Sequence, residues 1–147
     1  MSCVREARTA VAAASAHGGG KPVWVSWTLH EEPGQGLRSK ETVSEAYAAV
    51  AEYAPEAYLF NCCTSESIAP ALEELSALTD CPIGVYPNLL NIPENWTLDN
   101  DVSTGYREMD VAEFVDFASK WQRQGASIFG GCCGIGPKYI AALVEAG

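Results

Sequence analysis

Four short apolar runs alternate along the chain with longer segments whose apolar positions recur at helical spacing. The runs are rich in β-branched and aromatic residues and cover residues 22–29, 57–62, 83–88 and 126–131. Continuous apolar runs of this length are typical of parallel strands that are covered on both faces. The pattern therefore predicts an α/β fold with a parallel sheet.

Helical periodicity fills the intervals between these runs, and it also precedes the first of them. Stretches with cap residues at their starts and apolar stripes along their length predict five helices, one before the first strand and one after each strand. The order is thus a helix and four strand–helix units with right-handed crossovers. Residues 89–109 fit neither pattern, and a loop this long after a strand is often functional. The helix signals are the Ala-rich segment 5–16, the cap Ser39, the stripe from Ile68 to Leu78, the cap Asp110 with Gly125 past the helix end, and Pro137.

Composition narrows the class of protein. The chain has 147 residues, 48% of them hydrophobic and 19% charged, which predicts one compact domain. It shows no apolar stretch of ~20 residues and no signal-peptide order at its start, so we expect a cytoplasmic protein. The net charge of −10 would repel phosphate backbones and anionic lipids, which argues against nucleic acid and membrane as partners.

The cysteines carry the candidate chemistry. Cys3 and Cys81 stand alone, and we expect them to be small buried residues, whereas Cys62–Cys63 and Cys132–Cys133 are pairs at the ends of two predicted strands. Carboxyl ends of parallel strands meet at one edge of a sheet, so the pairs should converge there. Three converging thiolates would form a tetrahedral zinc site with one open position. A phosphate-binding loop at the glycine-rich segment 130–137 and a thiol redox pair are weaker readings, because their usual motifs are absent.

Three motifs together resemble the homocysteine S-methyltransferase family: FNC at 60–62, VYPN at 85–88 and GGCCGIGPKYI at 130–140. The resemblance implies a zinc-containing (β/α)8 TIM barrel whose Zn²⁺ is held by Cys62, Cys132 and Cys133. It places Tyr86 and Asn88 at the pocket mouth, where we expect them to contact substrate. Cys63 is an additional cysteine, and side-chain alternation along a strand favours Cys62 as the ligand.

The resemblance also implies which part of the barrel is present. The matching motifs belong to strands five to eight, so residues 1–147 are expected to form a partial barrel domain, the C-terminal half, with about four strand–helix units. The implied activity is methyl transfer to the thiol of homocysteine, giving methionine, with the methyl donor, and homocysteine against selenocysteine, left open. The alternative is a non-catalytic metal-binding half-barrel that needs a partner chain. Because a half-barrel has open sheet edges, we expect a homodimer or pairing with an N-terminal half.

Overall fold

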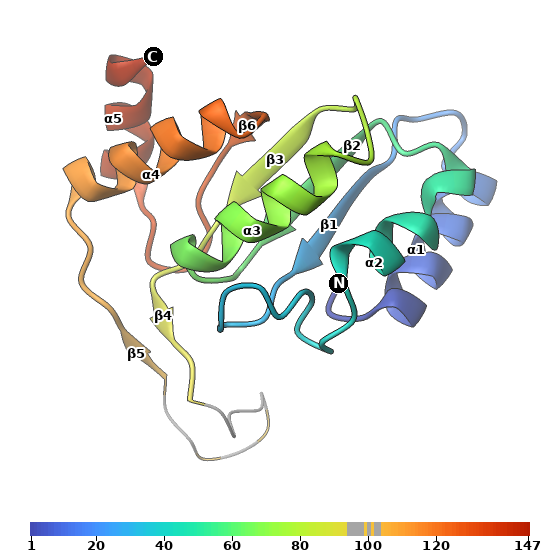
Figure 1. The fold of residues 1–147 in the computed structure, drawn as a ribbon, viewed down its shortest axis with the longest axis horizontal. Helices are drawn as coiled ribbons and strands as arrows, with labels where there is room; N and C mark the ends of the chain where they lie inside the picture. Colours follow the sequence, from blue (N-terminus) through green and yellow to red (C-terminus); the bar gives the residue numbers. More distant parts are fainter. Residues whose placement is uncertain (94–98, 100, 102–103) are drawn as a thin grey trace.

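A computed structural model describes residues 1–93, 99, 101 and 104–147 and confirms the α/β fold. Four parallel strands form one sheet in the order β1-β2-β3-β6 (Figure 1). The strands are β1 (Trp24–Thr28), β2 (Ala57–Asn61), β3 (Ile83–Tyr86) and β6 (Ala126–Phe129), each inside one of the predicted apolar runs.

The helices follow the predicted order. They are α1 (Val4–His17), α2 (Val43–Ala48) with the 3-10 turn η1 (Ala51–Tyr53), α3 (Ser65–Ser76), α4 (Val111–Arg123) and α5 (Pro137–Ala146). No helix among the described residues has both the length and the apolar character needed to cross a membrane.

The start of α2 corrects one expectation. The side chain of Thr42, rather than Ser39, caps the helix, because it accepts a hydrogen bond from the Glu45 amide while Glu45 accepts from the Thr42 amide. This reciprocal pair satisfies two amides of the first turn. The Ser39 hydroxyl instead donates to the carboxylate of Glu41 at 2.6 Å.

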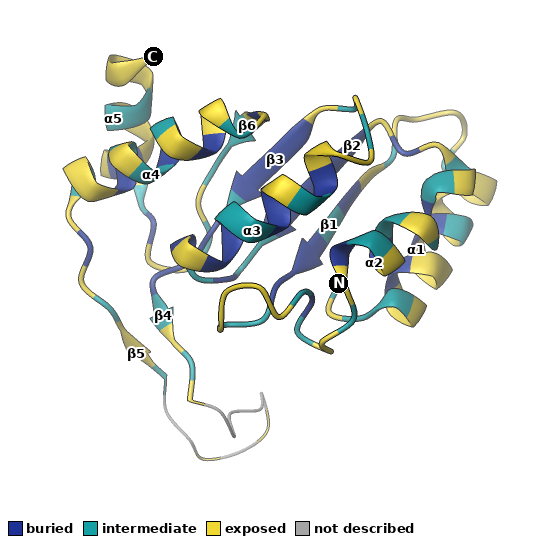
Figure 2. Cartoon of the chain, viewed as in Figure 1, coloured by how far each residue is buried: buried dark blue, intermediate teal, exposed yellow. Residues whose placement is uncertain are grey.

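The core lies between the sheet and the helices (Figure 2). Alternate strand side chains point to the two faces of a sheet. On the helical face, the ring of Trp27 on β1 stacks on Tyr58 on β2 with centroids 5.5 Å apart, and Tyr58 in turn meets Tyr47 of α2. On the other face, hydrogen bonds connect Ser26 with Asn61 and Tyr86.

The long loop is more ordered near its ends than the sequence indicated. Two short antiparallel strands, β4 (Leu90–Asn91) and β5 (Gly105–Tyr106), pair across it. The strands are too short to give a periodic signal. Trp96, inside this stretch, lies outside the described residues.

Gly125 after α4 has φ +103°, so the left-handed conformation predicted there is present.

The two edge strands of the sheet differ. The Met1 amino group donates to the Ser26 carbonyl at 2.8 Å, and the Thr28 amide donates to the Met1 carbonyl at 2.8 Å, so Met1 lies on the outer edge of β1. Among the described residues, β6 has no strand on its outer side. The open edge of the parallel sheet is therefore chiefly the β6 edge.

Candidate functional site

Residues 86–89, at and just past the end of β3, align the two cysteine pairs. On one side, the Cys62 amide donates to the Tyr86 carbonyl at 3.2 Å. On the other, the Cys132 amide donates to the Pro87 carbonyl at 2.8 Å, and the Leu89 amide donates to the Cys133 carbonyl at 2.8 Å. β3 lies between β2 and β6, so its extension reaches both loops. The order of the strands thus brings the pairs to one edge of the sheet.

Three of the six cysteines form a cluster there. The Sγ atoms of Cys62, Cys132 and Cys133 all lie within 4.8 Å of one another, and those of Cys132 and Cys133 are 3.8 Å apart. Cys62 and Cys132 are half-buried and Cys133 is exposed, so a small molecule can reach the sulfurs from solvent. The convergence that the sequence predicted is present.

Backbone geometry separates Cys62 from its neighbour. Cys62 has φ +50°, a left-handed conformation that ends β2 and turns its side chain toward the cluster. Cys63 is completely buried in the core, and burial raises the pKa of its thiol well above the usual range. Cys63 is therefore a core residue, which agrees with the choice of Cys62 from the sequence.

Asn88 is completely buried beside the cluster, and its side chain is fixed at both ends. Its Oδ1 accepts a hydrogen bond from the Leu90 amide at 3.1 Å, which directs Nδ2 at the Cys62 sulfur, 3.3 Å away. Its backbone amide donates to the Cys63 carbonyl at 3.0 Å. The amide therefore presents a fixed N–H donor to a cluster sulfur. Contact with a substrate stays a prediction for this residue.

Tyr86 is half-buried, and its hydroxyl donates to the Ser26 hydroxyl at 2.6 Å. Its predicted contact with substrate likewise stays a prediction. No pattern in the sequence pointed to Ser26, because its contact with Tyr86 depends on the register of three strands.

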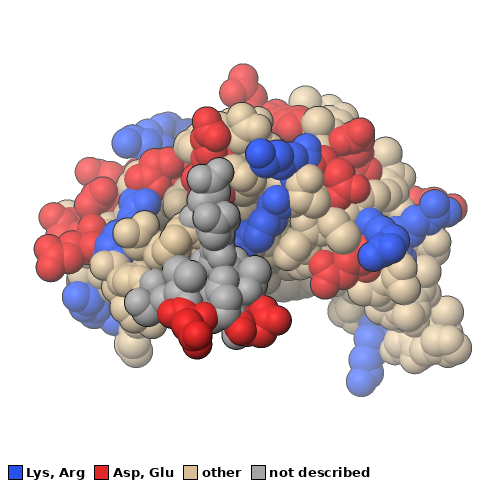
Figure 3. Space-filling model, turned by 90° about the horizontal axis from the view of Figure 1, so that it is seen from below, with Lys and Arg blue, Asp and Glu red and all other residues tan. Residues whose placement is uncertain are grey.

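Charged groups surround this edge of the sheet, which faces the viewer in Figure 3. Arg38 donates to the carboxylate of Glu31 at 2.6 Å and to the Cys62 carbonyl at 3.4 Å, which ties the loop after β1 to the cluster. Burial raises the pKa of Glu31, and Arg38 opposes this shift. Arg107, after β5, pairs through two nitrogens with Glu66 in the first turn of α3. No sequence motif singled out either arginine.

A glycine allows the cysteine loop to approach the loop after β3. Gly134 has φ +86°, and a Cβ atom there would lie 2.9 Å from the Leu89 Cβ and 3.0 Å from the Tyr106 ring. Both the left-handed backbone and the lack of space favour glycine. The glycine-rich pattern therefore serves close packing behind the cluster.

The cluster fits a thiophilic metal ion. Sulfur ligands on one tetrahedral zinc lie ~3.8 Å apart, because each Zn–S bond is about 2.3 Å long. The Cys132–Cys133 separation of 3.8 Å agrees with that value. Burial raises the pKa of the Cys132 thiol to about 12, so metal binding at neutral pH would release its proton. Three soft donors and one accessible side are the arrangement of an open metal site.

Known proteins are similar to this chain in sequence and in fold. Homocysteine S-methyltransferase 4 of Zea mays is 32% identical over 130 residues, which cover 85% of this chain and 36% of that protein. Homocysteine S-methyltransferase of Escherichia coli K12 is 32% identical over 121 residues, covering 82% of this chain and 37% of that protein. The metallated crystal structure of the E. coli homocysteine methyltransferase MmuM superposes with a TM-score of 0.75 at 26% identity, over 100% of this chain and 43% of that one.

This chain spans about a third of the length of the curated relatives that it matches. Its parallel strands and alternating helices correspond to part of the barrel of its structural relatives. The family model for homocysteine S-methyltransferases matches residues 1–147. The cysteines of the motifs meet at one edge of the sheet. The chain therefore belongs to the homocysteine S-methyltransferase family.

Proposed function

We propose that this chain is the metal-bearing part of a zinc-dependent S-methyltransferase that transfers a methyl group to the thiol of homocysteine, giving methionine. The observation that carries the proposal is the convergence of Cys62, Cys132 and Cys133 at the accessible edge of the sheet. Membership of the family and the metallated relative support it. The substrates would be homocysteine and a methyl donor.

The residues of the chain have separate tasks in this proposal. When bound, zinc would lower the pKa of a thiol in its open position, so that the substrate sulfur is a thiolate at neutral pH. Cys62, Cys132 and Cys133 would hold the ion, and exposed Cys133 borders the side from which the substrate enters. The Asn88 amide holds Cys62 in place through its hydrogen bond. The methyl donor would approach from the same open side.

Metal analysis tests the first part. We expect about one zinc per purified chain, bound through three thiolates. Cys132→Ser should lose the zinc. Cys81→Ser should keep it, because Cys81 lies outside the cluster, where its thiol donates a hydrogen bond to the Pro55 carbonyl. Zinc retained in the Cys132 variant would refute the ligand set.

Product formation tests the second part. The zinc-loaded chain is incubated with homocysteine and either S-methylmethionine or S-adenosylmethionine, and methionine is measured. Methionine formed by the wild-type chain and lost in Cys132→Ser supports the proposal. Zinc bound at full occupancy without product favours the alternative, a non-catalytic metal-binding half-barrel that needs a partner chain.

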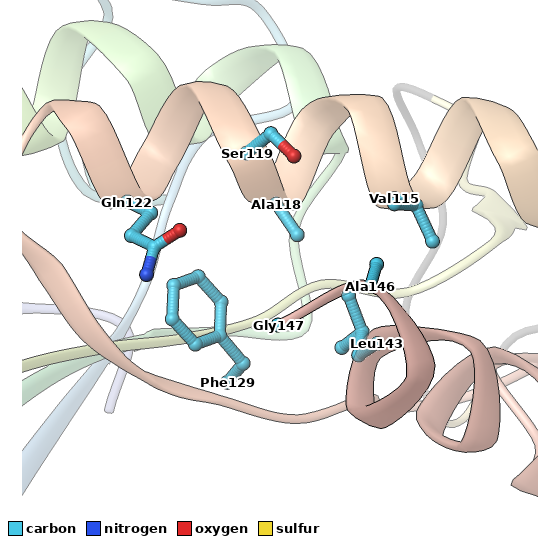
Figure 4. A pocket seen from close by; sticks show the side chains of 8 residues that line it. All are labelled: Val115, Ala118, Ser119, Gln122, Phe129, Leu143, Ala146 and Gly147. Carbon is cyan, nitrogen blue, oxygen red and sulfur yellow. The ribbon is translucent and has the colours of Figure 1, made fainter.

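We further propose that additional strand–helix units pair with the β6 edge. The groove beside this edge is apolar and is lined by Val115 and Ala118 of α4, Phe129 of β6 and Leu143 of α5, whose side chains converge in Figure 4. An uncovered strand edge and an apolar groove favour association. The family relatives are longer than this chain, which supports a complementary polypeptide as the occupant.

A homodimer is the other expected assembly. To join two copies into a closed sheet, β6 of one copy would have to displace Met1 from Ser26 and Thr28 of the other. Light scattering distinguishes the assemblies: a dimer mass supports self-pairing, and a monomer that binds little apolar dye refutes both.

Six free cysteines support a reducing compartment, and we propose the cytoplasm.

A further inference from the structure

The carbonyl group of Cys62 leaves the hydrogen-bond ladder of the sheet where β2 ends. The amide of this residue still donates to the Tyr86 carbonyl at 3.2 Å. Its φ of +50° then turns the chain, and the ladder resumes one residue later, where the Cys63 carbonyl accepts from the Asn88 amide at 3.0 Å. Within the described part of the chain, the donor to the Cys62 carbonyl is the side chain of Arg38, at 3.4 Å. The peptide that carries a cluster sulfur is therefore held from outside the sheet.

One nitrogen of Arg38 makes both of the contacts of its guanidinium group. Nη2 donates to the Cys62 carbonyl, and it also donates to Oε1 of Glu31 at 2.6 Å. This nitrogen carries two protons, so both are engaged. The short bond to Glu31 sets the direction of Nη2, which leaves the second proton for Cys62. The backbone of Arg38 is fixed as well, because its amide donates to the Thr28 carbonyl at the end of β1 at 3.0 Å.

The loop that carries Glu31 is fixed by the first turn of α3. The Thr64 hydroxyl donates to the Glu31 carbonyl at 3.2 Å, and the Ser67 hydroxyl donates to the carbonyl of the preceding residue, His30, at 2.8 Å. Ser67 is almost completely buried. Both hydroxyls follow Cys62 closely along the chain, so the loop after β1 is joined to the segment that holds this cysteine.

We propose that Arg38 is a positioning residue for Cys62 as a metal ligand, and that Glu31 acts through Arg38. The inference rests on the proposed function, because it takes Cys62 as a zinc ligand. A left-handed backbone is unfavourable for a residue other than glycine, and it persists only where neighbouring contacts hold it. Without Arg38, the metal-free chain can relax at Cys62, which moves its sulfur away from Cys132 and Cys133. Metal binding must then restore the conformation, and the cost is measured as lost affinity.

Zinc competition with a chromophoric chelator tests the role of Arg38. In Arg38→Ala the zinc affinity should fall about five- to thirtyfold, which corresponds to restoring one left-handed residue on binding. Arg107→Ala is the matched control, because Arg107 also pairs with a carboxylate at this edge and its side chain is 27% exposed, against 33% for Arg38. The Arg107 side chain bonds to Glu66 rather than to a cysteine, so the zinc affinity of this variant should equal that of the wild type.

Further variants separate the hydrogen bond from a general loss of packing. Arg38→Met keeps most of the aliphatic stem but has no donor, so it should lose as much zinc affinity as Arg38→Ala. Arg38→Lys keeps a donor and should bind zinc more tightly than either. Glu31→Ala should also weaken zinc binding. Combined with Arg38→Ala it should cause no further loss, because both residues act through one contact.

The outcomes distinguish the two proposals. If the wild-type chain binds no zinc, the proposed function fails and this inference fails with it. If the wild type binds zinc and Arg38→Met binds it equally tightly, or Arg107→Ala loses as much affinity as Arg38→Ala, only the inference is overturned. Additive losses in the double variant, or an unchanged affinity in Glu31→Ala, overturn the role of Glu31. Urea unfolding of each metal-free variant shows that its fold is intact, so that the loss of affinity is assigned to the site.

Discussion

Replacing Asn88 with alanine is the sharpest test of how the polypeptide supports the cysteine cluster. The side chain is completely buried and makes two hydrogen bonds, one to the Cys62 sulfur and one from the Leu90 amide. Because the truncated residue offers neither, we expect two separate effects, one on stability and one on metal affinity.

The size of each effect follows from these contacts. The lost hydrogen bond to the Cys62 sulfur costs about 1 kcal/mol, and the Leu90 amide left without its acceptor costs about 1–3 kcal/mol. We therefore expect Asn88→Ala to lower the free energy of unfolding of the metal-free chain by about 2–4 kcal/mol. Loss of a hydrogen bond to a metal ligand typically weakens metal binding by about ten- to a hundredfold.

Urea unfolding followed by tryptophan fluorescence measures the first effect, and zinc competition with a chromophoric chelator measures the second. Asn88→Asp is the informative companion, because it keeps an acceptor for Leu90 but places a carboxylate oxygen against Cys62. It should bind zinc more weakly than the wild type. Asn91→Ala should change neither quantity, since Asn91 is exposed. Wild-type zinc affinity in folded Asn88→Ala would refute the supporting role of the amide.

Three other predictions concern the surroundings of the cluster. Gly134→Ala should lower the free energy of unfolding by at least about 1–2 kcal/mol because of its positive φ, whereas Gly105→Ala, where no atom lies within 4 Å of a new Cβ, should be close to neutral in urea unfolding. The hydrogen bonds from Arg107 lower the pKa of Glu66 below 4.5, so their contribution is present above that pH and lost as the pH falls through the lowered value. The stability difference between wild type and Glu66→Gln, about 0.2–1 kcal/mol after solvent screening, should therefore vanish on acidification in urea titrations; a constant difference would refute it. The Cys63 thiol should resist Ellman's reagent until urea unfolds the chain, and rapid labelling of the native protein would contradict its burial.

The sequence predicted the elements that depend on local pattern. Each observed strand of the main sheet falls within an apolar run, and the two cysteine pairs converge because they follow strands of one parallel sheet. The start of α2 was misplaced because Ser39 and Thr42 are equally good cap residues, and only Thr42 has a glutamate three positions later.

Features that depend on strand register or on contacts between loops could not be predicted from the sequence. The Ser26–Tyr86 hydrogen bond passes over an intervening strand, and no spacing along the chain encodes it. The same is true of Asn88, whose pattern indicated a strand end but not which sulfur its amide would meet. The chain's own Met1 beside β1 could be recognised only from the fold.

The cysteine cluster makes metal binding and folding one linked equilibrium. Cys62 and Cys132 come from loops on either side of the β3 extension, so their sulfurs meet only when β2, β3 and β6 are assembled. An ion bound only to the folded chain adds about 2.7 kcal/mol of stability at a hundredfold excess over its dissociation constant. Chelators should therefore remove the ion and also lower the free energy of unfolding of the sheet. The bound ion would connect the loops that follow β2 and β6, so the concentration of free metal would determine the fraction of chains that are folded.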